Sequence, residues 1–121
     1  MKIEVDFLVI GSGLAGLNAS LRLAESNGSV LMVTKGKVSE SNTAYAQGGI
    51  ASVTSPTDSV DAHCQDTLQA GAGLCDPESV RSIVEAGPHA IERLVSLGVE
   101  FDRAGPGSYD LTREGGHSHR R

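Results

Sequence analysis

The sequence has no tryptophan and few other aromatic residues, which together make up 3% of its 121 residues. A hydrophobic core must therefore be built from aliphatic side chains. Basic residues are also scarce: 10 Lys and Arg stand against 15 Asp and Glu, for a net charge of −5. This balance argues against a general nucleic-acid or anionic-membrane surface, because such surfaces need clustered cations.

Long apolar runs and clustered cysteines are missing as well. No run approaches the roughly 18 apolar residues that span a bilayer. The apolar stretch at 7–10 is too short for a signal peptide and directly follows Glu4 and Asp6. We therefore expect a cytoplasmic protein whose two cysteines, Cys64 and Cys75, are reduced thiols. Without a Cys-x-x-Cys pair or clustered histidines, the sequence predicts no metal site.

The residues that are present have the balance of a globular domain, with 39% hydrophobic and 21% charged residues. The length predicts one domain at most. Residues 3–10 end in a nearly continuous apolar run, which is typical of a parallel strand buried on both faces. Apolar residues then recur at helical spacing from Leu14 to about Ser26, and Asn27-Gly28 is expected to stop that helix. Residues 30–34 are a second apolar strand. The pattern predicts a right-handed β–α–β unit.

A glycine-rich turn joins the first strand to the helix. Gly11-x-Gly13-x-x-Gly16 in this context is typical of a dinucleotide site. The first glycine permits the tight turn, the second lets the backbone approach a pyrophosphate, and the third lets helix and strand pack closely. The acidic residue that binds ribose in NAD proteins is replaced by Thr34 and Lys35, which disfavours a plain NAD site. The alternative is a glycine-rich turn without a ligand.

Two further helices are predicted after residue 57. Either Asp58 or Ser59 caps the first, and the glycines of 71–73 end it. Asp76 and Pro77 predict the start of the second helix, because an N-cap residue is followed by proline at the first helical position.

The second helix is expected to bury a stripe made of Val80, Ile83 and Val84. Its pattern is broken or kinked at residues 87–88, where glycine precedes proline. Residues 99–101 are predicted as a short extended piece.

Residues 35–57 are polar and have no sustained period. We predict an ordered loop that touches a ligand, with a mobile linker as the alternative. Only two segments are convincing parallel strands, so their apolar faces are expected to stay open and the chain to be an N-terminal part of a larger protein.

Residues 41–50, Ser-Asn-Thr-Ala-Tyr-Ala-Gln-Gly-Gly-Ile, offer groups that suit contact with a flat heteroaromatic ring. Together with the glycine turn, this segment resembles the fumarate reductase/succinate dehydrogenase flavoprotein family and, within it, the L-aspartate oxidases. Further matches lie at 66–68, 71–73, 75–76 and 111–121. The resemblance implies an α/β, Rossmann-like FAD-binding fold, present in 1–121 only as its N-terminal βαβ part plus following helices. The rest of the FAD domain, the capping domain and a C-terminal helical domain would lie outside these residues.

The resemblance also implies where the cofactor and the substrate bind. Asn42 stands where succinate dehydrogenases have a histidine bonded to the flavin, which implies non-covalent FAD. Glu114 matches a glutamate that orients L-aspartate through the substrate ammonium group. The implied FAD-binding residues are Gly11, Ser12, Gly13, Leu14, Ala15, Gly16, Lys35, Asn42, Thr43, Ala44, Tyr45, Ala46, Gln47, Gly48 and Gly49.

The implied activity is oxidation of L-aspartate to iminoaspartate, with a hydride passing from the substrate Cα to FAD and with oxygen or fumarate as the acceptor. The product would enter NAD biosynthesis through a quinolinate synthase. The catalytic arginine of the family does not lie in these residues. The alternatives are a fumarate reductase or succinate dehydrogenase flavoprotein, or a non-catalytic partial FAD-binding module.

Histidines and arginines of the second half allow more than one interpretation. His63 and His89 are predicted to be surface residues or to have their hydrogen bonds satisfied. His117 and His119 are interpreted as lying near flavin and substrate rather than as a metal pair, because a third ligand is missing. Arg120 and Arg121 could bind a dicarboxylate or be structural.

Overall fold

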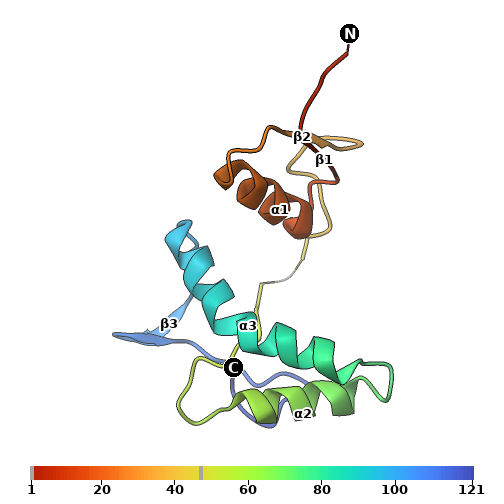
Figure 1. Ribbon diagram of the computed structural model, residues 1–121. Coiled ribbons are helices and arrows are strands. Elements are labelled where there is room, and N and C mark those ends of the chain that lie inside the picture. The colour runs from red at the N-terminus through yellow and green to blue at the C-terminus, as the bar shows by residue number, and fades with distance from the viewer. Residues whose placement is uncertain (1, 47) are drawn as a thin grey trace. The chain divides into compact units, whose positions relative to one another are not determined.

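The computed structural model describes residues 2–46 and 48–121. The chain forms two compact units, Met1–Gly48 and Gly49–Arg121, whose elements are labelled in Figure 1. The boundary falls inside the long polar segment at 35–57. Each unit has its own secondary structure and is described by itself.

The first unit is the predicted β–α–β unit. Strand β1 (Phe7–Ile10) leads through the glycine turn into helix α1 (Leu14–Glu25), and strand β2 (Val30–Val33) follows. The two strands are parallel, with Phe7 paired to Val30 and Ile10 paired to Val33. Strand β1 begins at Phe7 rather than at residue 3, because β2 offers partners only from that register onward.

The end of α1 follows the stop signal in the sequence. Asn27 takes a left-handed backbone conformation with φ of 65°. Its N–H donates to the carbonyl of Ala24, and the N–H of Gly28 donates to the carbonyl of Leu23. This is the Schellman arrangement, which satisfies the last helical carbonyls. A side chain at Gly28 would collide with the Phe7 ring, so the turn also sets the packing of α1 on β1.

The apolar strands are only partly covered, as expected for a pair of strands with one helix. Leu8 is 58% exposed and Ile10 is 81% exposed. A parallel strand in a complete α/β sheet is covered on both faces. The prediction of a strand buried on both faces is therefore wrong for this chain, while the prediction of open apolar faces is confirmed.

The polar segment after β2 is a loop with short turns. The N–H of Ala44 donates to the carbonyl of Ser41 at 3.0 Å, and the N–H of Ala46 donates to that of Thr43 at 3.3 Å. These bonds give local order without a helix or strand, which agrees with the predicted loop.

The second unit contains α2 (Val60–Ala70) and α3 (Pro77–Ser96), which pack on each other. Ser59 is the N-cap of α2, since its hydroxyl accepts from the N–H of Ala62, and Asp76 caps α3 in the same way through Ser79. This decides between the two predicted caps of α2.

Helix α3 continues through Pro88 instead of breaking. Proline lacks the N–H of a helical hydrogen bond and bends a helix when it lies inside one, and Figure 1 shows α3 changing direction along its length. The prediction of a kink is confirmed, and that of a break is wrong.

The core of this unit lies between α2 and α3. Cys64, Val80 and Val84 are its buried residues, and Val53 and Leu68 pack against them. Ile83 is 72% exposed, so its predicted burial is wrong. Val80 and Val84 of α3 pack on α2, and Arg81 beside them pairs with Asp61 of α2, whereas the exposed Ile83 is not part of this core.

A small hairpin follows α3, where the sequence indicated only an extended piece at 99–101. Strands β3 (Arg103–Gly105) and β4 (Ser108–Tyr109) are antiparallel. Gly107 has φ of 78°, and it follows Pro106 in the connecting turn. Proline followed by a glycine with positive φ is typical of a type II turn. The Pro106-Gly107 pair was therefore the signal in the sequence for a hairpin whose first strand begins two residues after the predicted piece at 99–101.

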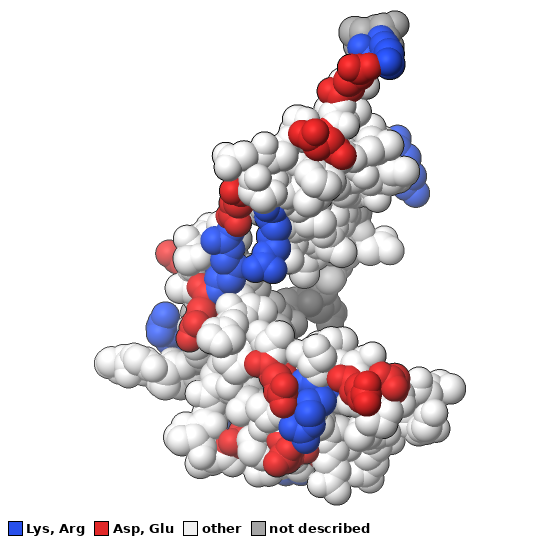
Figure 2. All heavy atoms as spheres, in the orientation of Figure 1, with Lys and Arg blue, Asp and Glu red and all other residues white. Residues whose placement is uncertain are grey.

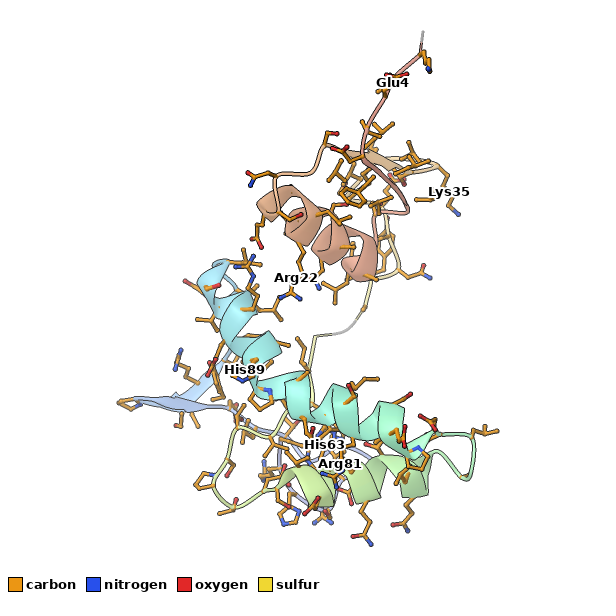
Figure 3. All side chains as sticks on the ribbon, viewed as in Figure 1. Glu4, Arg22, Lys35, His63, Arg81 and His89 are labelled. Atoms are coloured by element: carbon orange, nitrogen blue, oxygen red, sulfur yellow. The ribbon has the colours of Figure 1, made fainter. Side chains whose placement is uncertain are left out.

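Positive and negative side chains are interspersed on the face shown in Figure 2. Arg81 of α3 exemplifies this mixing, since it pairs with Asp61 of α2 at 2.6 Å and with Glu85 at 3.1 Å. Figure 3 places Arg81 over α2. These pairs are exposed, and exposed pairs contribute about 0–1 kcal/mol to stability.

Candidate dinucleotide site and C-terminal loop

The glycine turn between β1 and α1 is held by backbone contacts. Gly11 has φ of 107°, a conformation that side chains disfavour. Its N–H donates to the carbonyl of Val33 at 2.8 Å, which ties the turn to β2. A Cβ on Gly16 would lie 2.1 Å from the carbonyl oxygen of Gly11, so the helix can approach the turn only because Gly16 has no side chain.

Gly13 differs from both neighbours in the motif. Its backbone is extended, with φ of −71° and ψ of 176°. The atom nearest to a Cβ built there is the hydroxyl oxygen of Thr43, at 3.8 Å. Among the described residues nothing in the protein itself requires glycine at this position. The described residues therefore leave the space beside Gly13 open.

The N-terminus of α1 favours an anion. The N-cap residue Gly13 supplies no capping side chain, and the described first turn of α1 carries no acidic residue. The first N–H groups of a helix have no intrahelical acceptor, and the helix dipole places partial positive charge there. The hydroxyl of Thr43 accepts from the N–H of Leu14 at 3.2 Å, which brings the loop after β2 against the turn.

A cleft of about 660 Å³ opens beside this turn. Ser12 lies at its base, 4% exposed, and donates to the hydroxyl of Thr34 at 3.3 Å. Lys35 supplies a positive charge, and Figure 3 shows it on the segment after β2. The full lining is Ile10, Gly11, Ser12, Gly13, Val33, Thr34, Lys35, Glu40, Ser41, Asn42 and Thr43.

The cleft thus brings together part of the predicted FAD-binding set: Gly11, Ser12, Gly13, Lys35, Asn42 and Thr43. Leu14, Ala15 and Gly16 follow in the first turn of α1. Ala44, Tyr45, Ala46, Gly48 and Gly49 do not line the cleft, and Tyr45 is 76% exposed. Gln47 lies outside the described residues. Glu40 was missed by the sequence analysis, although it directly precedes the polar motif.

Glu114, the predicted substrate residue, belongs to the second unit and is exposed. It lies in a turn of the segment 111–121, called here the C-terminal loop. The N–H of His117 donates to the Glu114 carbonyl at 3.1 Å, and Gly116 has φ of 86°. The hydroxyl of Thr112 donates to Oε1 of Glu114 at 3.0 Å, so the carboxylate keeps a second oxygen for another donor.

Arg121 closes this loop from inside the unit, and its side chain is fully buried. Its Nε and Nη2 donate to both oxygens of Asp58, at 2.7 and 2.8 Å. Its Nη1 donates to Oδ2 of Asp66 at 2.6 Å. The structural interpretation of Arg121 is therefore the correct one of the two that the sequence left open.

Ser118 completes the network by donating to Asp66 Oδ2 from both its N–H, at 2.7 Å, and its hydroxyl, at 2.8 Å. The N–H of Ser118 is the main reason that the pKa of Asp66 lies well below its ordinary value. The hydrogen bonds from Arg121 hold the pKa of Asp58 below its ordinary value. We call Asp58, Asp66, Ser118 and Arg121 the clasp. The two buried residues of the clasp, Asp66 and Arg121, thus have hydrogen-bond partners, as buried charged groups require.

His63 differs from its prediction, whereas His89 follows it. His63 and His117 lie edge to face, with ring centroids 6.1 Å apart. The Nδ1 atoms of both are buried and accept or donate no hydrogen bond within the described ranges. Burial lowers the pKa of His63. The prediction of a surface or satisfied His63 is therefore wrong, whereas His89 is exposed and pairs with Glu92 as expected.

His117 and His119 do not converge on one point. Nδ1 of His119 lies 2.8 Å from the hydroxyl of Ser118 and 3.6 Å from Asp58. Over residues 2–46 and 48–121, no three metal-ligating side chains gather as a candidate ion site. The same residues contain no helix that is long and apolar enough to cross a membrane.

A parallel β–α–β unit, a glycine turn and a helix N-terminus beside a cleft are together typical of a dinucleotide-binding protein. The family described as "FAD binding domain" matches residues 6–121. The chain therefore belongs to the FAD-binding domain family, and its cofactor is FAD.

Curated relatives are similar along nearly the whole chain. L-aspartate oxidase 2-b of Nicotiana tabacum, named as chloroplastic, is 53% identical over 116 residues, covering 96% of this chain and 18% of the relative. The L-aspartate oxidase of Vibrio cholerae is 50% identical, with 98% and 23% covered. The chain thus spans about a fifth of the length of these relatives.

Solved structures agree on the fold. E. coli quinol fumarate reductase FrdA superposes with a TM-score of 0.93 at 30% identity, covering 98% of this chain and 21% of the other. Mycobacterium smegmatis Sdh1 in complex with UQ1 gives a TM-score of 0.90 at 31% identity, with 97% and 20% covered. These matches confirm the predicted α/β fold of the flavoprotein family.

Proposed function

We propose that this chain is the N-terminal part of the FAD-binding domain of an L-aspartate oxidase. The intact protein would oxidise L-aspartate to iminoaspartate with oxygen or fumarate as acceptor. The proposal is supported by relatives named L-aspartate oxidase at 50–53% identity. The observation that supports FAD binding is the cleft at Gly13, where a Cβ would meet only the Thr43 hydroxyl, at 3.8 Å, among the described atoms.

The residues of the first unit suit the pyrophosphate of FAD. Free N–H groups at the start of α1 would donate to its oxygens, and the absence of an acidic first turn among the described residues avoids repulsion. Lys35 would add a positive charge at the edge of the cleft. When bound, FAD supplies the two-electron acceptor that amino acids lack. Asn42 lines the same cleft and has no nucleophilic nitrogen like that of histidine, so we propose non-covalent binding.

The role proposed for Glu114 is to distinguish substrates by charge. L-aspartate carries an ammonium group, whereas fumarate and succinate do not. A carboxylate paired with that ammonium group forms a charge-assisted hydrogen bond. Because Thr112 occupies one oxygen of Glu114, the other is available for the substrate. The charge therefore favours the amino acid over its unsubstituted analogues.

Two other functions are tested against this one. A fumarate reductase or succinate dehydrogenase flavoprotein is favoured by the solved structures, but at only 30–31% identity. A non-catalytic partial FAD-binding module is favoured by the exposed apolar faces of β1, with Ile10 81% exposed. We propose instead that further parts of the FAD domain cover these faces in the intact protein.

The experiment uses the intact flavoprotein, purified and assayed with L-aspartate and with succinate. The proposal expects a yellow protein that releases FAD on acid precipitation and forms hydrogen peroxide with L-aspartate only. Flavin retained in the acid pellet together with succinate oxidation would establish the dehydrogenase alternative. A colourless, inactive protein would establish the partial module.

The pathway and the compartment are part of the same proposal. Iminoaspartate would be consumed by a quinolinate synthase in NAD biosynthesis, because the imine hydrolyses unless it is used. We propose a cytoplasmic location, while the plant relatives are named as chloroplastic. A catalytic arginine is proposed to lie outside these 121 residues.

A further inference from the structure

The C-terminal loop is held to α2 by charged groups that come from distant parts of the sequence. Asp66 of α2 accepts three hydrogen bonds, two from Ser118 and one from Arg121. Arg121 in turn binds Asp58 through two nitrogens. Removing one partner of a buried pair leaves an uncompensated charge, so the network strongly favours one arrangement of the loop.

The backbone of the loop is closed at the same place. The N–H of Arg121 donates to the carbonyl of Thr112 at 3.0 Å, and the guanidinium of Arg120 donates to that of Leu111 at 3.0 Å. Within this closed loop, Nε of Arg113 donates to the carbonyl of His117 at 2.8 Å. The ends of the loop are thus joined, and Glu114 lies at the turn between them.

Contact with α2 fixes the turn itself. A Cβ built on Gly116 would lie 3.4 Å from Cβ of Ala70, so the turn packs on the end of α2. Glu114 is exposed and yet belongs to a segment that is pinned on both sides. An exposed carboxylate on a rigid loop loses little entropy when it binds a cation.

We propose that Asp66 and Arg121 are positioning residues that hold the C-terminal loop so that Glu114 meets the substrate ammonium group. They touch neither substrate nor flavin in this proposal, and they act through the clasp and Glu114. The inference rests on the function proposed above, and it adds the source of the amino-acid specificity. Tight loop geometry matters because a small misplacement of a binding group costs much of its benefit.

The test compares Asp66→Asn with Asp61→Asn in the intact flavoprotein. Asp61 lies on the same helix, is 82% exposed and pairs only with the exposed Arg81 among its described contacts, so it is a matched control. We expect Asp66→Asn to lower kcat/KM for L-aspartate at least tenfold, through a higher KM. Fumarate reduction and bound FAD are expected to stay within twofold. Asp61→Asn should change neither activity.

A double-mutant cycle separates positioning from a general defect. In a Glu114→Gln background, Asp66→Asn should cause less than a twofold further loss with L-aspartate, because the group it positions is already gone. Equal losses in both backgrounds, or equal losses with L-aspartate and fumarate, would overturn the proposal.

Hydrogen exchange of residues 111–121 gives a readout that does not depend on activity. In the wild type, the N–H groups of Ser118 and Arg121 should be protected from exchange. In Asp66→Asn, the exchange rates of these groups should rise at least tenfold. Unchanged exchange would overturn the clasp as the cause of loop order. If Asp66→Asn fails to fold or to bind FAD, Ser118→Ala serves as the second variant, because it removes one hydrogen bond to Asp66. Ser118→Ala is expected to cause a smaller loss of activity that is selective for L-aspartate. If this selective loss is absent, the proposal is refuted. A wild-type protein inert toward L-aspartate would instead refute the proposed function.

Discussion

Alanine substitutions at Gly16 and Gly13 should affect different properties. Gly16→Ala should lower the stability of the fold, whereas Gly13→Ala should weaken FAD binding and leave the stability nearly unchanged. A Cβ on Gly16 would lie 2.1 Å from the Gly11 carbonyl oxygen and 3.1 Å from its carbon, both backbone atoms. Forced repacking of this kind costs about 1–3 kcal/mol and occasionally more. Alanine gains roughly 1 kcal/mol over glycine inside a helix. Because these backbone atoms cannot rotate away, we expect a clash cost of about 3 kcal/mol, at the upper end of that range. The clash then outweighs the gain, and Gly16→Ala should destabilise the fold by about 2 kcal/mol.

Gly13→Ala meets no such obstacle within the protein. The nearest described atom would be 3.8 Å away, and the backbone conformation suits alanine. Its effect on unfolding should be small, within about 0.5 kcal/mol or slightly stabilising. In the proposed complex with FAD, however, the methyl group would take the space of the pyrophosphate. A clash of about 1–3 kcal/mol corresponds to roughly 5- to 150-fold weaker FAD binding, and Gly13→Val should abolish it.

The assay measures thermal midpoint and FAD dissociation constant for both variants of the intact flavoprotein. Gly115→Ala is the control, because a Cβ there meets nothing within 4 Å and the backbone needs no left-handed conformation. The steric reasoning is refuted if Gly16→Ala keeps the wild-type midpoint. The placement of the pyrophosphate is refuted if Gly13→Ala binds FAD as tightly as the wild type.

Three further predictions concern the second unit. Glu114→Gln should lower kcat/KM for L-aspartate by about one to two powers of ten, because a hydrogen bond to a charged group contributes about 1.5–3 kcal/mol; steady-state assays with L-aspartate and fumarate check this, and equal losses on both would contradict it. The lowered pKa of Asp66 means that its ionised form stabilises the fold above its ordinary pKa of 3.8 and that this contribution is lost as pH falls below that value. The free energy of unfolding should therefore drop with a shallower slope in Asp66→Asn, measured by denaturant titrations between pH 5 and pH 3; parallel slopes would contradict it. Val84→Ala should destabilise the fold by about 1.5–3 kcal/mol and Ile83→Ala by less than about 0.5 kcal/mol, since only Val84 is buried, and similar losses in chemical denaturation would refute the assignment of the core.

Local signals in the sequence predicted the local structure well. The β–α–β unit, the cap at Asp76, the stop at Asn27-Gly28 and the roles of Gly11 and Gly16 all follow from short-range chemistry. Each depends on a backbone conformation or a hydrogen bond within a few residues, which the sequence displays directly. The same signals predicted that β1 and β2 would leave apolar faces open.

Contacts between distant residues were not predictable in the same way. Arg121 meets Asp58 and Asp66, which lie 63 and 55 positions away in the sequence. A charged residue in a polar segment follows no periodic pattern that would reveal its partner. A structural role for Arg121 and a role in dicarboxylate binding were therefore equally consistent with the sequence. The predicted burial of Ile83 was wrong for a related reason. The apolar stripe of a helix can be wider than the surface that a neighbouring helix covers, and the sequence of α3 does not show how much of this stripe α2 covers.

The two candidate sites are therefore built by different physical means, and their defects should differ in kind. The cofactor turn relies on missing side chains: Gly16 keeps α1 close to the turn, and Gly13 keeps a space open. Such a site fails by collision, which affects every reaction that uses FAD. The C-terminal loop relies on buried charges, with Asp66 at the centre of the clasp. Loss of a hydrogen bond in the clasp should make the C-terminal loop more mobile. This would change the position of Glu114 but leave the turn at Gly13 intact. Substitutions in the turn should then lower every FAD-dependent activity together, whereas substitutions in the clasp should lower the activity with L-aspartate and leave fumarate reduction nearly unchanged. The proposal therefore assigns substrate specificity to the network around Arg121 rather than to the flavin-binding turn.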